Sequence, residues 1–433
     1  MRNASLARGS WLATQRDDLC LARRYRRLFS VYLVFVALVT LCYGVINVVG
    51  RNAWVIGDWL INYSGGFVRR GLPGEIVLRA GHVLHLSPVY LVLVLQLLTY
   101  AVIFYSVWRL LARTNWSAWV LAMLVSPATL AFQVLDPLAG LRKEEILLGG
   151  LGMLLVFLLD RPPAAPWLSL YLTLLGVGCV LSHEGMIFFV PYLFAAVAIG
   201  LDSVPRALKI CAIPFLVIAA CGYIVRGHIG DAATARAICS SLGFVVTAGK
   251  LPPMCSGAIE YLTRDTASAR IDATAYARVY HSLPLYTIDA LLAVIPYGMA
   301  FASLWRHSAL RRGLLVVVSI AAVSIAASIP LFVYAEDWGR WIYIHLFCVF
   351  LLLLLIDYRR QGDSATCGPP PGLPANRSLR VASVVLVVIY ATCWDLPHVT
   401  LYQARFGYFG VARYAYEYPS RPHLSWARDI SRR

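Results

Sequence analysis

A chain of 433 residues in which 60% are hydrophobic and only 14% are charged carries more apolar surface than one soluble core can bury. A mean hydropathy of +0.69 excludes an ordinary soluble protein for the same reason. The net charge of +16 comes without an RNA- or DNA-binding motif, so it indicates contact with an anionic membrane surface and no nucleic-acid partner.

The first apolar run, Leu28–Val49, follows a tail (1–27) that is rich in arginine. It is too long for the apolar part of a signal peptide, and no small-residue cleavage site follows it. We therefore expect a retained first helix with a cytoplasmic N-terminus.

Further apolar runs recur along the chain, and with the first they predict an all-α fold, a polytopic membrane bundle of about eleven transmembrane helices. The short ones, Ile146–Leu159 above all, leave a re-entrant or tilted element open. An odd count places the residues after Leu396 outside. The later spans are expected at Pro88–Leu110, Ser117–Leu135, Ile146–Leu159, Trp167–Leu181, Ile187–Leu201, Leu208–Val225, Tyr286–Trp305, Gly313–Val333, Trp341–Ile356 and Val381–Trp394.

These spans divide the chain into a cytoplasmic basic tail (1–27), an N-terminal bundle (28–225) with a first external loop (50–87), a large extracytoplasmic loop (226–285), a C-terminal bundle (286–395) and an extracytoplasmic tail (396–433). The tail is rich in Tyr and Phe, which is typical of a headgroup-zone band and also of sugar stacking. A Gly-, Pro- and Ser-rich loop, 357–380, is expected to be a flexible linker. Lysines and arginines divide about evenly between the two sides, so the orientation depends mainly on the N-terminal arginines.

The large loop is expected to form a small helical region, with helices at Ala232–Ala237 and Thr266–Tyr280. Its two cysteines, Cys239 and Cys255, could form a disulfide in an oxidising compartment, although sequence alone leaves this open. The chain has no C-x-x-C pair, so neither a zinc nor a redox motif is predicted.

The stretch from Gly57 to Glu75 is unusual for a connection between membrane helices. Its glycines and one proline permit tight turns and a close approach of the main chain to a ligand. Between them lie Asp58, Asn62, Tyr63 and the pair Arg69-Arg70. We interpret this stretch as part of an active site at a membrane surface.

Three further clusters fall on the same side of the expected topology. They are Asp136 with Arg142, Lys143 and Glu144; His183 with Glu184; and Glu336 with Asp337 and Arg340. Ionisable residues near membrane depth are costly, so a functional site is the default hypothesis for them.

Each cluster also has a structural explanation. A surface ion pair among Glu336, Asp337 and Arg340 would contribute about 0–1 kcal/mol. His183 and Glu184 would cap a helix end, and Glu75 would be an ordinary acid in the first turn of a helix. Lys143 stands out because lysine is rare in this chain.

Transfer of a sugar from a lipid-linked phosphate needs the residue types of these clusters. A positioned carboxylate removes the proton of the acceptor hydroxyl, and fixed cations neutralise the leaving phosphate. Arginine binds phosphate oxygens in a bidentate manner and lysine supplies a compact charge, so this chemistry needs no metal or cofactor.

The layout resembles the GT-C superfamily of integral-membrane glycosyltransferases and the bacterial surface-polysaccharide polymerases of similar topology. In those families the first external loop carries a catalytic acid just after the first helix and runs partly along the membrane surface. Asp58 occupies that place here, and Pro73–His85 could be the surface helix. The resemblance covers the first two helices and their loop best, and this loop lacks the aspartate pair of many members. It implies a polyprenyl-linked sugar donor and inversion at the anomeric carbon.

From these observations we expect a glycosyltransferase in the bacterial inner membrane, active on its extracytoplasmic face toward a glycan, lipid-linked or protein acceptor. Asp58 is the expected base, with Asp136 or Glu184 as substitutes. The expected residues for phosphate or substrate binding are Asn62, Tyr63, Arg69, Arg70, Arg142, Lys143, Glu144, His183, Glu336, Asp337 and Arg340. A repeat-unit polymerase, a lipid-linked saccharide transporter or flippase, and an acyltransferase with His183 as base remain as alternatives.

Overall fold

The computed structural model describes residues 2–114, 116–159, 162–247, 250–363, 377–399 and 408. This part of the chain is helical, with no β-structure beyond one isolated bridge between Thr247 and Lys250. The helices are α1 (Arg2–Val49), α2 (Val55–Trp59), α3 (Leu72–Leu84), α4 (Pro88–Leu110), η1 (Leu111–Arg113), α5 (Ala118–Val125), α6 (Phe132–Leu135), α7 (Glu145–Phe157), α8 (Ala165–Ser182), η2 (Glu184–Phe189), α9 (Pro191–Gly200), α10 (Val204–Arg226), α11 (Ala232–Ser241), η3 (Pro253–Cys255), α12 (Ala258–Tyr261), α13 (Thr266–Val279), α14 (Ser282–Trp305), η4 (Ser308–Leu310), α15 (Arg311–Tyr334), α16 (Trp338–Asp363) and α17 (Arg377–Thr392).

Seven helices in the described residues are long and apolar enough to cross a membrane. They lie in α1, α4, α8, α10, α14, the η4–α15 segment and α16. The expected number of about eleven spans is therefore not confirmed. The remaining expected spans coincide with α5 and α6, α7, η2 and α9, and α17, which are short or interrupted.

The prediction of one continuous helix over Ser117–Leu135 is wrong, and a proline explains why. Pro127 lacks a backbone donor and disfavours helical geometry at the residue before it. Ser126 is accordingly extended, so α5 ends at Val125 and a turn separates it from α6. A similar interruption divides Ile187–Leu201, where Pro191 starts α9 directly after η2.

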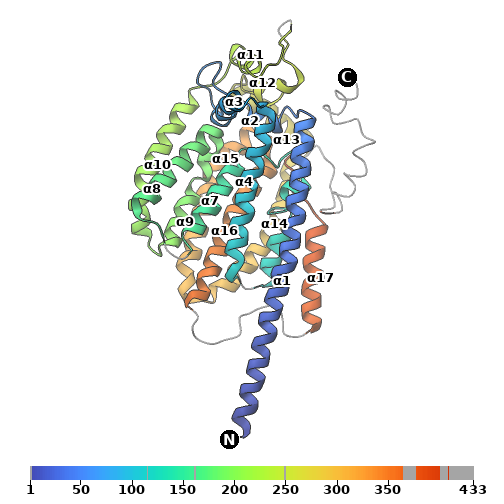
Figure 1. Ribbon diagram of the computed structural model, residues 1–433, viewed down its shortest axis with the longest axis vertical. Coiled ribbons are helices and arrows are strands. Elements are labelled where there is room, and N and C mark those ends of the chain that lie inside the picture. Colours follow the sequence, from blue (N-terminus) through green and yellow to red (C-terminus); the bar gives the residue numbers. More distant parts are fainter. Residues whose placement is uncertain are drawn as a thin grey trace.

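The bundle is organised around α16. Most of its apolar stretch is buried, whereas each of the other six candidate spans buries less than half of its own. It packs against α15, α14, α7 and α9, while α8 pairs with α10 and α4 pairs with α7 and α1. Figure 1 shows the start of α1 projecting from one end of the bundle and α2, α3, α11 and α12 gathered at the other.

The residues between α10 and α14 form a helical cap (residues 227–247 and 250–281). The expected helices in this loop are confirmed as α11 and α13, and Cys239 and Cys255 form the disulfide that the sequence left open. The disulfide lies in a small core that also contains Ile61 and Val68 of the first external loop. The cap and the first loop therefore fold as one unit above the bundle.

Two expectations fall partly outside the described residues. The linker expected at 357–380 is helical at both ends, where α16 continues to Asp363 and α17 begins at Arg377; residues 364–376 are not described. The aromatic tail lies outside the described residues from 400 onward, apart from Tyr408.

Candidate functional site

The first external loop folds back toward the bundle after α2, and two local features shape it. Gly74 in α3 lies against the backbone of Ile61, where any side chain would collide with the carbonyl group. Arg70 has a φ of 67°, a left-handed conformation that is costly for a residue other than glycine. This backbone carries Arg69 and Arg70 into the space beneath the cap.

The segment after α6 is fixed through the backbone of Leu141. Its φ is 61°, and its carbonyl accepts hydrogen bonds from Nε1 of Trp59 and Nε2 of Gln96, both at 2.7 Å. The backbone N–H of Leu141 in turn donates to the hydroxyl of Tyr100 at 3.3 Å. Because both backbone groups are held, the directions of the next two side chains, Arg142 and Lys143, are set by the helices behind them.

Lys143 and Asp58 form a buried pair behind the wall of the site. Nζ of Lys143 lies 3.6 Å from Oδ1 of Asp58 and donates to the carbonyl of Arg70 at 2.8 Å. Lys143 is 0% exposed and Asp58 is 1% exposed. Burial would raise the pKa of Asp58, but the charges of Lys143, Arg142 and Arg70 lower it to about 2. Burial lowers the pKa of Lys143 to about 8 against the opposing effect of Asp58.

Glu184 joins η2 to the first external loop. Its Oε1 lies 2.6 Å from Nη2 of Arg70 and 3.3 Å from Nη1 of Arg69, and its Oε2 accepts from Nε of Arg70 at 2.8 Å. Burial raises the pKa of Glu184, but Arg70 and its other neighbours hold it well below the usual range. Glu184 is thus an ionised anchor for two arginines.

Glu144 connects the second, third and fourth clusters. Its Oε1 lies 3.5 Å from Nη2 of Arg340 and 3.7 Å from Nε2 of His183. Arg340 also binds Oδ2 of Asp337 at 2.8 Å. Nδ1 of His183 accepts the N–H of Gly185 at 3.1 Å, and burial together with Arg70 lowers the pKa of His183 to about 4. Because Nδ1 accepts, this neutral histidine carries its proton on Nε2.

Arg142 differs from the other cations of the site. It is buried, yet its side chain makes no ion pair or hydrogen bond with the residues that the structure describes. Burial and the neighbouring Arg340 lower its pKa, although a guanidinium remains charged in proteins. A buried cation without an ion-pair partner is ready to accept an anion.

These groups surround a cavity of about 1550 Å³ between the bundle and the cap. The cluster residues that line it are Arg69, Arg70, Arg142, His183, Glu184, Glu336, Asp337 and Arg340. A second part of the wall is apolar and comes from the ends of α10, η2 and α15: Ile187, Phe188, Tyr223, Leu331 and Tyr334. The four clusters thus meet at one end of the bundle.

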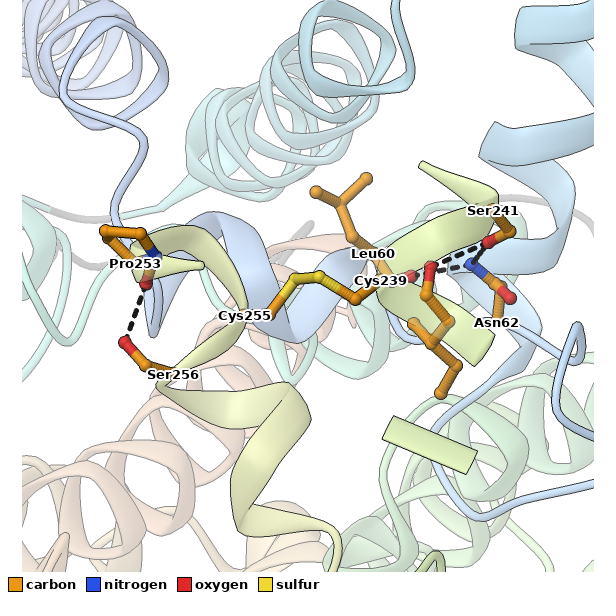
Figure 2. Close-up of a disulfide and its surroundings, with 8 residues drawn as sticks. Leu60, Asn62, Cys239, Ser241, Pro253, Cys255 and Ser256 are labelled. Atoms are coloured by element: carbon orange, nitrogen blue, oxygen red, sulfur yellow. Dashed lines mark hydrogen bonds between the residues drawn. A yellow bond between two sulfur atoms is a disulfide. The ribbon is translucent and has the colours of Figure 1, made fainter. Parts of the chain in front are cut away.

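Several expected site residues do not line the cavity. Asp58, Lys143 and Glu144 lie behind its wall: Lys143 contacts Arg70 and Glu144 contacts Arg340, both of which line the cavity, and Asp58 contacts Lys143. Tyr63 and Asn62 belong to the junction between the first loop and the cap. Asn62 donates to the hydroxyl of Ser241 at 3.1 Å, beside the disulfide (Figure 2), so its role is to hold this junction.

Several residues that line the cavity were not identified from the sequence. Arg264 and Tyr261 come from the cap, Arg51 and Arg226 from two helix ends, and His398 from the segment after α17. Oδ2 of Asp136 lies 2.6 Å from Nδ1 of His398. Arg51, Arg226, Tyr261, Arg264 and His398 belong to none of the four clusters, so only their position in the fold identifies them.

No group of three or more His, Cys, Asp or Glu side chains is arranged to hold a metal ion in the described part of the chain. Comparisons with models of protein families, with characterised proteins and with solved structures found no match. The residues and the shape of the cavity are therefore the basis for assigning a function.

Proposed function

We propose that the protein is a membrane glycosyltransferase that takes its sugar from a polyprenyl phosphate or pyrophosphate donor. The observation that carries the proposal is Arg142, a buried cation without an ion-pair partner among the described residues, on the wall of a large cavity that is apolar on another side. A lipid-linked phosphate has both parts, an anionic head and an apolar tail.

The polar wall suits the head of this donor. Arg142 and Arg340 raise the local positive potential, and a phosphate between them would relieve their mutual repulsion. Guanidinium groups bind phosphate oxygens through paired hydrogen bonds that are stronger than neutral ones. The same groups would stabilise the negative charge that develops on the leaving phosphate.

The apolar wall suits the tail. Tyr223 at the end of α10 and Tyr334 at the end of α15 lie on the cavity wall, and both are solvent-accessible. α10 and α15 each pack against η2 and α9, so these elements lie between them. A polyprenyl chain entering from the membrane would meet apolar surface up to the arginines.

The geometry changes the role that we give to Asp58. A general base must reach the proton that it abstracts. Asp58 is buried behind the wall, and its lowered pKa makes it a poor proton acceptor. We assign it to fixing the charge of Lys143, which in turn holds the carbonyl of Arg70.

The volume of the cavity bears on the choice between a transferase with a separate acceptor and a polymerase of lipid-linked repeats. About 300–1,000 Å³ is usual for a site that holds one small ligand. At about 1550 Å³, this cavity has room for a donor and an acceptor side by side. Both versions of the chemistry need that room, so the polymerase stays as the alternative within the same proposal.

The alternatives from other classes receive less support. A transporter site is expected near the middle of the membrane, in interrupted helices, whereas these charges gather at the cap end of the bundle. An acyltransferase with His183 as base would need a free lone pair on the ring, whereas Nδ1 accepts the N–H of Gly185 and Nε2 of the neutral ring carries the proton.

We further propose that the cavity faces the extracytoplasmic side of a bacterial inner membrane. The disulfide of the cap supports this, because disulfides persist in oxidising compartments. The arginine-rich start of α1 lies at the opposite end of the bundle from the cap (Figure 1), which agrees with a cytoplasmic N-terminus.

The proposal is tested by the binding of polyprenyl monophosphate and polyprenyl pyrophosphate to the full chain in lipid nanodiscs. We expect Arg142→Met to weaken binding by about 10- to 100-fold, because a hydrogen bond to a charged group contributes about 1.5–3 kcal/mol. Arg79→Met, an exposed arginine of α3 that does not line the cavity, is the matched control. Equal affinity of the wild type and Arg142→Met, or no binding at all, would contradict the proposal.

A further inference from the structure

Asp136 and His398 form a pair at the edge of the cavity. Oδ2 of Asp136 accepts hydrogen bonds from the backbone N–H of His398 at 2.8 Å and from Nδ1 of its ring at 2.6 Å. The other carboxylate oxygen, Oδ1, accepts the N–H groups of Leu138 and Ala139. This carboxylate is therefore buried and fixed in direction.

The segment that carries His398 is itself held in place. The hydroxyl of Tyr286 donates to the carbonyls of Pro397 and His398, at 3.0 Å and 2.8 Å. Gly339 at the start of α16 lies against the same backbone, where a side chain would collide with the carbonyl of Pro397. His398 is thus anchored from α14, from α16 and by Asp136.

The pairing determines which ring nitrogen can do chemistry. Because the carboxylate accepts from Nδ1–H, the neutral ring carries its proton on Nδ1 and leaves a lone pair on Nε2. His398 lines the cavity, and its Nε2 makes no hydrogen bond with the residues described by the structure. An aspartate that orients a histidine in this way is the arrangement by which many hydrolases prepare a general base.

We propose that His398 is the catalytic base of the transfer and that Asp136 is its positioning residue. This inference rests on the proposed function, because it assigns the proton transfer in that reaction. It differs from the expectation that a carboxylate of the first loop takes this part. Asp136 keeps a place in the site, but it acts through the imidazole.

Nε2 of His398 takes the proton of the acceptor hydroxyl while that oxygen forms a bond to the anomeric carbon of the donor. The bond between this carbon and the phosphate oxygen breaks, and its electron pair stays with the polyprenyl phosphate or pyrophosphate. Arg142 lies on the wall of the same cavity and faces this charge. The imidazolium then releases its proton to water, and Asp136 stabilises the positive charge in the meantime.

The other acids of the cavity are less suited to this step. Glu184 is paired with two arginines and Asp337 with Arg340. Glu336 is the one competitor, because it is half-buried on the cavity wall and burial together with Asp337 raises its pKa. Unlike that of His398, its side chain makes no hydrogen bond or ion pair among the described residues that would fix its direction.

The test measures the release of polyprenyl phosphate from labelled polyprenyl-phosphate hexoses and pentoses, with extracted cell-surface glycan as acceptor and the full chain in nanodiscs. His398→Gln keeps an amide that can donate to Asp136 but cannot accept the proton. We expect its kcat to fall by about 10²–10⁴-fold with donor affinity unchanged. Asp136→Asn should lower kcat in the same direction, and added imidazole should restore part of the activity of His398→Ala, which a purely structural role would not allow.

The outcomes separate the two proposals. If the wild type transfers sugar and His398→Gln retains its kcat, or if Glu336→Gln alone abolishes it, the assignment of His398 is refuted and the proposed function stands. If the wild type releases no polyprenyl phosphate from any of these donors, the proposed function is refuted and the role of His398 with it. Loss of donor binding in His398→Gln without rescue of His398→Ala by imidazole would identify a structural latch and overturn the inference.

Discussion

The buried pair of Asp58 and Lys143 allows a prediction that separates a structural charge from a catalytic one. At 3.6 Å and an effective dielectric constant of about 20, two opposite charges attract each other by about 5 kcal/mol. The exposure of both side chains is 2% or less, so water does not replace a missing partner. Removing one member of such a pair typically costs about 3–5 kcal/mol, because the other charge stays buried and unpaired.

We therefore expect Asp58→Asn and Lys143→Met each to lower the free energy of unfolding by about 3–5 kcal/mol. The double variant should lose less than the sum of the two, with a coupling energy of about 2–3 kcal/mol. The measurement is a double-mutant cycle by denaturant titration of the protein in mixed micelles. Single variants as stable as the wild type, with transfer abolished only in Asp58→Asn, would refute this reasoning and restore Asp58 as the base.

Three further predictions concern the cap, the acid limit of stability and the segment after α17. Replacing Cys239 and Cys255 with serine should cost the cap about 3 kcal/mol, because the disulfide closes a loop with a sequence separation of 16, and limited proteolysis should then cut the cap faster. The pKa of His183 is lowered from 6.5 to about 4, so between these pH values the unfolded chain binds a proton at this residue and the folded chain does not. The free energy of unfolding should therefore fall by on the order of 3 kcal/mol as the pH drops from 6.5 to 4. His183→Gln should reduce this pH dependence in thermal unfolding curves. Gly339→Ala should displace the backbone of residues 397–398 at a cost of about 1–3 kcal/mol, whereas Gly298→Ala in α14, with open space at its Cβ position, should leave thermal stability unchanged or slightly higher.

Much of the helical layout could be predicted from local sequence. The bounds of α4 match the expected Pro88–Leu110 because Pro88 marks the start and the apolar run ends in Arg109. Glu75 is the first-turn acid that its position after Pro73 indicated, and it also accepts the N–H of Tyr63 at 3.1 Å. Length alone did not reveal the interruption at Pro127, where the local backbone rule outweighed hydrophobicity.

The site was predictable as a gathering of clusters but not as a set of roles. The glycine-rich context of Asp58 drew attention to its loop, yet the partner that fixes its charge, Lys143, is distant in sequence. His398 lies in a short segment, 395–399, whose residue pattern matches no catalytic motif considered in the sequence analysis. Its importance depends on a contact with Asp136 across 262 positions, and no local pattern encodes such a contact.

That contact also has a consequence for the biogenesis of the protein. The chain is synthesised from its N-terminus, so the arginines of the cavity are made before Pro397 and His398. Only when α17 has been synthesised can the following segment pack against Gly339 and complete this side of the cavity. A nascent chain would consequently lack this side of the cavity wall until its last segment is made.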